Sequence, residues 1–94
     1  MTTLALLRVQ VEAPMRKYGV VHAAVFGSVA RGDDQEESDI DFLVEFEPGR
    51  SLLDLAALRI ELREALGRDV DVATRNSLHP HLRDQILGEL VPVL

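Results

Sequence analysis

Two short motifs in the first half of the sequence combine residue types that suit phosphate chemistry. Gly27 and Ser28 follow an apolar run, and Asp39 and Asp41 come after ten intervening residues. Glycine lacks a Cβ, so a phosphate group can approach its backbone closely. Ser28 is expected to open a helical turn, where free N–H groups and its own hydroxyl favour an anion. The spacing therefore predicts a phosphate-binding turn at Gly27 and Ser28.

The second motif predicts a platform for metal ions. Asp39 and Asp41 alternate along a predicted strand, so their side chains share one face with origins roughly 6–7 Å apart. That separation suits two hard cations about 3.5–4 Å apart, each of which needs several oxygen ligands. Asp71, between two valines of a later strand, is the expected third carboxylate. Asp69 shares its face by the same period of two and is the alternative, although its place at the strand's beginning favours solvation.

Other polar residues near the motifs allow two interpretations. Ser28 would have the same position if it only capped a helix, and Arg31 could contact phosphate or pair with the acidic residues that follow it. The acidic run itself matches no ligand spacing and is expected to be a solvated loop: Asp33, Asp34, Glu36 and Glu37. His79 and His81 flank Pro80 and are expected to lie on the surface at the beginning of a helix, since no cysteine or third histidine accompanies them.

The elements that must position these residues follow from hydrophobic periodicity. Helices are predicted where apolar residues recur every three or four positions, and strands where they alternate or run together. Pro14 should kink or restart the first helix, and Ser51 with Asp54 resembles a capping box. The predicted order is a helix over 3–18, a strand over 20–26 buried on both faces, a short turn or helix over 27–32, a strand over 39–46, a helix over 51–66, a strand over 69–74 and a helix over 80–90. The expected fold class is α/β of the α+β type, one domain over 1–94 with about three strands covered by helices.

Composition restricts the class of protein. The chain has 94 residues, no cysteine and a net charge of −6, which excludes a disulfide scaffold and a thiolate site and argues against binding a nucleic-acid template. No apolar run reaches the ~18–20 residues of a membrane span and no signal pattern begins the chain, so a cytoplasmic protein without membrane contact is expected. Eight of the sixteen acidic residues lie within 33–47, which holds no lysine or arginine.

The two motifs together resemble a known family. Gly27-Ser28, ten residues and Asp39-x-Asp41 match the G-S-x10-D-x-D pattern of the DNA-polymerase-β-like nucleotidyltransferases. The fuller G-S-x-A-R-G…S-D-I-D form, the V-D-V-A stretch at 70–73 and the segment over 77–87 make the whole chain similar to the minimal nucleotidyltransferase (MNT) branch. The resemblance implies the nucleotidyltransferase fold, with a small mixed sheet.

The resemblance also implies a reaction and assigns roles to residues. AMP would pass from ATP to a hydroxyl group, with the ATP phosphates at Gly27 and Ser28 and two Mg²⁺ ions on Asp39 and Asp41. Asp71 would ligate one ion beside the attacking hydroxyl, a position often assigned as the general base. The family often carries a basic residue where Val29 stands, so Arg31 is left as the nearby cation for the phosphates.

Members of this branch are commonly antitoxins, so the resemblance implies a partner. That partner would be an all-helical HEPN ribonuclease toxin, AMPylated on a tyrosine by the MNT protein. Two alternatives are an antitoxin that neutralises its toxin by binding alone and a catalytic subunit that modifies a small molecule. Apolar surface beyond the core would serve a homo-oligomer or the toxin interface.

The net negative charge of the chain is concentrated in residues 33–47. Two Mg²⁺ ions would add +4 where the chain alone repels a triphosphate. We therefore expect nucleotide binding to depend strongly on a divalent metal ion.

Overall fold

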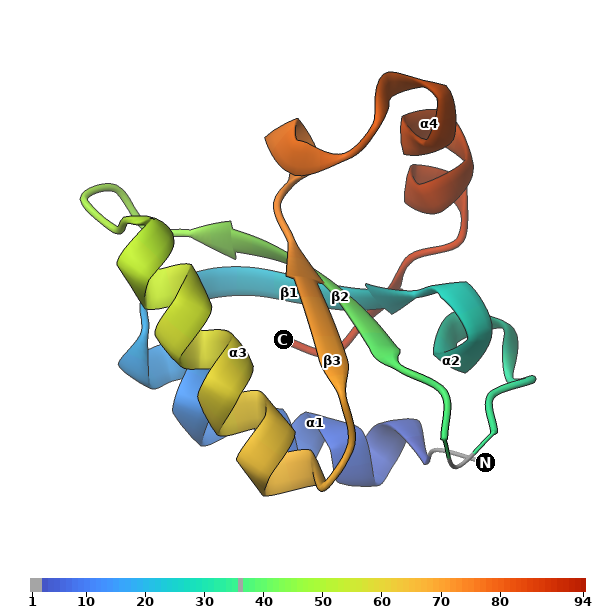
Figure 1. Ribbon diagram of the computed structural model, residues 1–94, viewed down its shortest axis with the longest axis horizontal. Coiled ribbons are helices and arrows are strands. Elements are labelled where there is room, and N and C mark those ends of the chain that lie inside the picture. The colour runs from blue at the N-terminus through green and yellow to red at the C-terminus, as the bar shows by residue number, and fades with distance from the viewer. Residues whose placement is uncertain (1–2, 36) are drawn as a thin grey trace.

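A computed structural model describes residues 3–35 and 37–94 and has a mixed sheet with helices packed against it (Figure 1). Within these residues, four α-helices and one short 3₁₀ helix precede or separate the strands along the chain. Their bounds are α1 Leu4–Lys17, β1 Val20–Phe26, α2 Gly27–Arg31, β2 Ile40–Phe46, α3 Leu52–Leu66, β3 Val70–Ala73, η1 Arg75–Ser77, α4 Pro80–Gly88 and β4 Val91–Pro92.

The sheet has the strand order β3-β2-β1-β4. β1 is antiparallel to both β2 and β4, whereas β2 and β3 are parallel and are connected through α3. This confirms the predicted fold class and adds a fourth, two-residue strand. Sequence reasoning missed β4 because Pro92 cannot donate a ladder hydrogen bond, so a segment containing it does not look like a strand.

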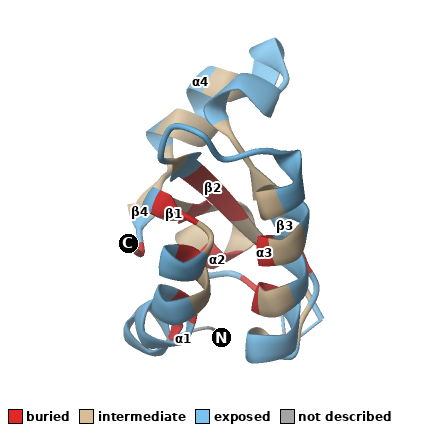
Figure 2. Ribbon diagram, turned by 90° about the vertical axis from the view of Figure 1, so that its left-hand side faces the viewer, coloured by how far each residue is buried: buried red, intermediate tan, exposed pale blue. Residues whose placement is uncertain are grey.

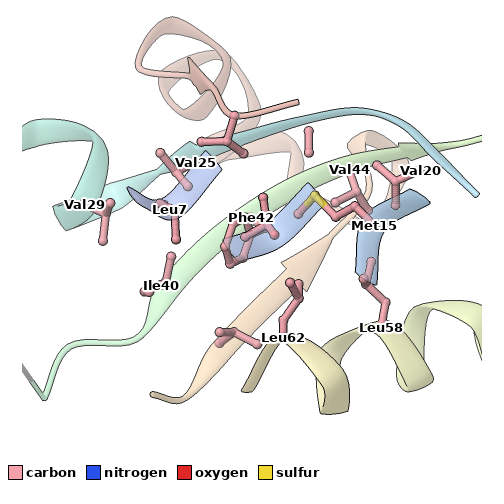
Figure 3. Packing of buried hydrophobic residues seen from close by; sticks show 14 residues of the cluster. Leu7, Met15, Val20, Val25, Val29, Ile40, Phe42, Val44, Leu58 and Leu62 are labelled. Atoms are coloured by element: carbon pink, nitrogen blue, oxygen red, sulfur yellow. The ribbon is translucent and has the colours of Figure 1, made fainter. Parts of the chain in front are cut away.

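The core lies between one face of the sheet and helices α1 and α3. Phe42, from the middle of β2, is fully buried and lies among side chains from both helices (Figure 3). The remaining positions of the cluster are apolar as predicted: Leu7, Val11, Met15, Val20, Ala23, Val25, Val29, Ile40, Val44, Leu58, Leu62, Val70 and Val93. Figure 2 shows that these buried positions follow β2 and the inner faces of the helices, while α4 lies at the opposite end of the molecule from α1.

Several local predictions are confirmed and others need correction. Ser51 caps α3 with a complete capping box, its hydroxyl accepting from Leu53 N–H and its own N–H donating to Asp54 Oδ2 at 2.9 Å. By contrast, α1 runs through Pro14 as one helix instead of restarting. β1 is not buried on both faces, since Val21 and His22 are exposed. His79 and His81 are exposed at the beginning of α4, as predicted.

The expectation of a fully solvated acidic loop is wrong at Asp34. Its side chain is only 1% exposed and forms an ion pair with Arg68, whose Nη1 lies 3.4 Å from Asp34 Oδ2. Arg68 also donates to the carbonyl oxygen of Ser38, which ties the loop to the segment before β3. Periodicity could not reveal this contact because the two residues are 34 positions apart. Asp33 and Glu37 are exposed as expected, and Glu36 lies outside the described residues.

β3 forms one edge of the sheet. There the guanidinium of Arg59, on α3, donates from Nε to the carbonyl oxygen of Val70 at 3.0 Å.

None of the helices among residues 3–35 and 37–94 is long and apolar enough to cross a membrane.

Candidate active site

The strand register brings the predicted chemical residues to one part of the sheet. Asp41 lies opposite Phe26 at the end of β1, directly before Gly27, and opposite Asp71 on its other side. One carboxylate on the central strand β2 therefore has the glycine turn on one flank and a second carboxylate on the other. The two motifs and the V-D-V segment, separate in the sequence, meet at this point because β1 and β3 both pair with β2.

Electrostatic repulsion is concentrated at Asp41. Partial burial raises the pKa of the Asp41 carboxyl above its ordinary value, and the negative charges of Asp71, Asp39 and Glu89 raise it further. The positive charge of Arg31 opposes these effects without outweighing them. Asp39 itself is exposed immediately before β2. The site is thus a group of like charges that would favour binding a cation.

Two features of the structure at Gly27 disfavour a side chain there. Its φ of +70° lies in the left-handed region that side-chain-bearing residues rarely adopt. A Cβ at this position would collide with Asp41 Oδ2. The sequence prediction attributed the glycine to the approach of a phosphate group. The structure adds that its missing side chain is also the space occupied by the Asp41 carboxylate.

Ser28 and Arg31 occupy the short helix α2, which is stabilised by burial of Val29 in the core. Phe26 is the N-cap of this helix, so the interpretation of Ser28 as only a helix cap is wrong. Arg31 lies 3.4 Å from Asp33 Oδ2 through its Nε, so the pairing with the acidic run that was the alternative to a phosphate contact is present. Its predicted contact with phosphate stays a prediction.

Glu89 belongs to this site and was missed by sequence reasoning. The Gly27 N–H donates to Glu89 Oε1 at 3.1 Å, and Arg31 Nη1 lies 3.5 Å from Glu89 Oε2. Glu89 caps the C-terminus of α4 and is 62 positions from Gly27. No local pattern could indicate this contact, because it depends on how α4 and β4 return to β1.

The geometry separates the two candidates for the third carboxylate. Asp71 pairs in register with Asp41 and is close enough for its charge to raise the pKa of that carboxyl. Asp69 precedes β3, is exposed and forms an ion pair with Arg63, Nε to Oδ1 at 2.9 Å. These contacts support the choice of Asp71.

Carboxylate oxygens are the donors that Mg²⁺ prefers. Partial burial, followed by the negative charges of neighbouring carboxylates, raises the pKa of Asp41, and a bound cation would offset both effects. The donor set at Asp39, Asp41 and Asp71 therefore fits a divalent ion. Among residues 3–35 and 37–94, no three acidic or histidine side chains are gathered closely enough to hold one ion as they lie. The predicted two-ion site stays a prediction.

A groove of about 720 Å³ lies over the same sheet face as the Asp41 carboxylate. Leu43 and Glu45 alternate with Asp41 along β2, and Ala24 is the β1 partner of Leu43. The other walls come from η1 and from the segment after α4, including Arg75, Leu90 and Pro92. The lining combines apolar with polar side chains and includes none of the three aspartates, so the groove runs along the sheet face next to Asp41 without containing it.

Comparison with known proteins gives consistent matches over nearly the whole chain. A family model described as a nucleotidyltransferase domain matches residues 8–93. A candidate protein adenylyltransferase of Methanocaldococcus jannaschii is 59% identical over 78 residues, which cover 83% of this chain and 84% of the relative. The protein adenylyltransferase MntA of Thermococcus cleftensis is 40% identical over 77 residues, covering 82% of this chain and 78% of MntA.

Solved structures agree with the fold. The structure of a candidate minimal nucleotidyltransferase is 46% identical, with a TM-score of 0.81, and the match covers 97% of this chain and 96% of that one. A chain from a complex of tri-AMPylated HEPN toxin and MNT antitoxin of Shewanella oneidensis is 20% identical, with a TM-score of 0.72, covering 98% of this chain and 72% of that one. At that identity the second likeness concerns the fold alone.

Proposed function

The chain belongs to the nucleotidyltransferase domain family, in its minimal nucleotidyltransferase branch, and from this premise we propose that it transfers AMP from ATP to a hydroxyl group of a HEPN-type toxin, for which it is the antitoxin. The observation that carries the proposal is the register pairing of Asp41 with both the Gly27 turn and Asp71. This pairing joins an anion-accepting backbone to a group of carboxylates on one sheet face.

Different groups of the chain would bind the phosphates of ATP and the Mg²⁺ ions. The backbone at Gly27 and the hydroxyl of Ser28 receive the phosphates, and Arg31 supplies positive charge beside them. The Gly27 N–H already donates to a carboxylate, which supports its ability to donate to a phosphate oxygen. Asp39, Asp41 and Asp71 would hold Mg²⁺, which supplies neutralisation of the charge that develops on the transferring phosphoryl group.

The transfer itself is a displacement at phosphorus. The acceptor oxygen forms a bond to the α-phosphorus, the bond from that phosphorus to the β-bridging oxygen breaks, and pyrophosphate leaves. Asp71, on the edge strand, takes the proton of the attacking hydroxyl. Reactions of this class depend on alignment and charge stabilisation more than on covalent participation by the protein, so a sheet that pairs Asp41 with Asp71 in register is suited to it.

The relatives support a protein as acceptor. Two of them are named as protein adenylyltransferases, and the Shewanella complex pairs an AMPylated HEPN toxin with its antitoxin. The groove on the same sheet face as Asp41 has Leu43, Leu90 and Pro92 in its lining, which would offer apolar contacts to an aromatic side chain such as the tyrosine that the family resemblance suggested.

The proposal is tested with ATP labelled at the α-phosphate, Mg²⁺ and the HEPN-type product of an adjacent gene. We expect label on the partner, and a loss of at least about a hundredfold in the variant Asp39→Ala/Asp41→Ala, since removal of charge-stabilising groups typically costs that much. Asp71→Ala should lose transfer as well, whereas the matched control Asp69→Ala, an exposed acid two positions away, should retain it.

Two outcomes would contradict the proposal. Unlabelled partner with the wild-type protein removes the enzymatic function. A double variant that transfers no AMP yet still protects cells from the toxin would show that binding alone neutralises it.

A further inference from the structure

The carboxylate of Glu89 contacts two groups that the proposed function assigns to phosphate binding. These groups are the backbone N–H of Gly27 and the guanidinium of Arg31. Glu89 Oε1 accepts from the Gly27 N–H at 3.1 Å, and Glu89 Oε2 lies 3.5 Å from Arg31 Nη1. The Glu89 side chain is 22% exposed and the Arg31 side chain 50%. A carboxylate and a phosphate oxygen make the same charge-assisted contacts to an amide and a guanidinium, so the two anions would need the same groups.

We propose that Glu89 is a built-in competitor of the nucleotide, whose carboxylate must leave Gly27 and Arg31 before a phosphate group of ATP can bind there. This inference rests on the proposed function of the same site. It makes Glu89 a residue that sets nucleotide affinity and does not take part in the chemical step.

The surroundings of Glu89 indicate what holds it in place. Asp41 is also near, and the negative charge of Glu89 contributes to raising the pKa of that carboxyl. Glu89 is therefore held by Gly27 and Arg31 against repulsion from the carboxylates on the sheet. An incoming phosphate would add to this repulsion and would need the same two donors, which favours exchange over simultaneous binding.

The position of Glu89 in the fold allows it to move without unfolding the core. It follows Gly88 at the end of α4, a helix without a fully buried residue, and precedes the two-residue strand β4. Gly27 and Arg31, in contrast, belong to α2, which is anchored by the buried Val29. Displacement is thus expected on the side of Glu89, while the phosphate-binding turn stays fixed.

The test compares Glu89→Gln and Glu89→Ala with wild type by isothermal titration calorimetry. The probes are ATP and inorganic tripolyphosphate, each with and without Mg²⁺. Glu89→Gln keeps the side chain's shape and removes only its charge, so it guards against a variant that fails to fold. Because the variants lose the competing negative charge, both should bind both probes about tenfold more tightly.

Asp33→Asn is the matched control. It removes one negative charge beside the same arginine, 3.4 Å from Arg31 Nε, and leaves the Gly27 N–H with its acceptor. Its affinity for either probe should stay within about twofold of wild type. In a ¹⁵N spectrum without ligand, the Gly27 amide signal should move in Glu89→Ala and not in Asp33→Asn.

The outcomes separate this inference from the proposed function. Wild-type binding that Glu89→Gln leaves unchanged overturns the inference alone. Weaker Mg²⁺-dependent ATP binding in Glu89→Gln also overturns it, because Glu89 would then be a metal ligand. Tighter binding in the variants together with an unlabelled partner protein supports the inference and removes the proposed transfer. If no form of the protein binds either probe, both are overturned.

Discussion

At the scale of single residues, Gly27 and Asp41 form one unit. The left-handed φ of Gly27 and the collision of a Cβ with Asp41 Oδ2 are two independent reasons why another residue is disfavoured. Ala at this position would therefore suffer both backbone strain and a steric conflict, and the conflict would disappear if Asp41 were shortened.

We accordingly predict that Gly27→Ala lowers the free energy of unfolding by about 2 kcal/mol in wild type and by only about 1 kcal/mol in an Asp41→Ala background. Urea denaturation of the four proteins in this double-mutant cycle measures the difference. Equal costs in the two backgrounds would show that the Asp41 carboxylate does not depend on the missing Cβ.

At the scale of elements, helices α1 and α3 are joined on their outer side by a polar contact. Tyr18 Oη donates to Glu61 Oε1 at 2.8 Å, and Lys17 Nζ lies 2.6 Å from the same oxygen. The hydrogen bond from Lys17, followed by the one from Tyr18, lowers the pKa of the Glu61 carboxyl below its ordinary value of 4.5. This contact adds to the apolar packing of both helices on the sheet.

The pH dependence of this contact follows from the sign of the pKa shift. Its stabilisation is fully present above pH 4.5 and is lost as the pH falls through the lower pKa of folded Glu61. We predict that Glu61→Gln slightly lowers the Tm at pH 7 and that its difference from wild type disappears below that folded-state pKa. Thermal unfolding from pH 7 to pH 3 checks this, with the exposed Glu64→Gln as control. A difference independent of pH would contradict the assignment.

The elements also show how far the sequence could predict this molecule. The placement of Asp41 on a strand and of a turn at Gly27 could be predicted because a strand alternates with a period of two and a glycine after an apolar run favours a turn. The segment that carries Glu89 could not, since its contact with Gly27 spans 62 positions. Asp34 was misjudged for the same reason, because its partner Arg68 lies in a distant segment.

At the scale of the whole molecule, the charge of −6 combines with the local group of carboxylates. A polyphosphate approaching this face meets charge of its own sign, which a divalent cation would reverse. We predict that ATP binds at least about tenfold more weakly in EDTA than in Mg²⁺ at 0.15 M salt, where the screening length is about 8 Å. Calorimetry of the wild-type protein measures this ratio, and equal affinity in both solutions would contradict the predicted metal site.

The contact at the outer edge of β3 has a consequence for strand addition to the sheet. The unpaired N–H and C=O groups of an open edge strand can bind another polypeptide, which then adds to the sheet through backbone hydrogen bonds. Here the guanidinium of Arg59 already occupies the carbonyl oxygen of Val70, next to Asp71. Strand addition at this edge would require that arginine to leave. The chain therefore protects the sheet edge beside Asp71 with a side chain of its own, as natural sheets do to prevent unwanted strand pairing.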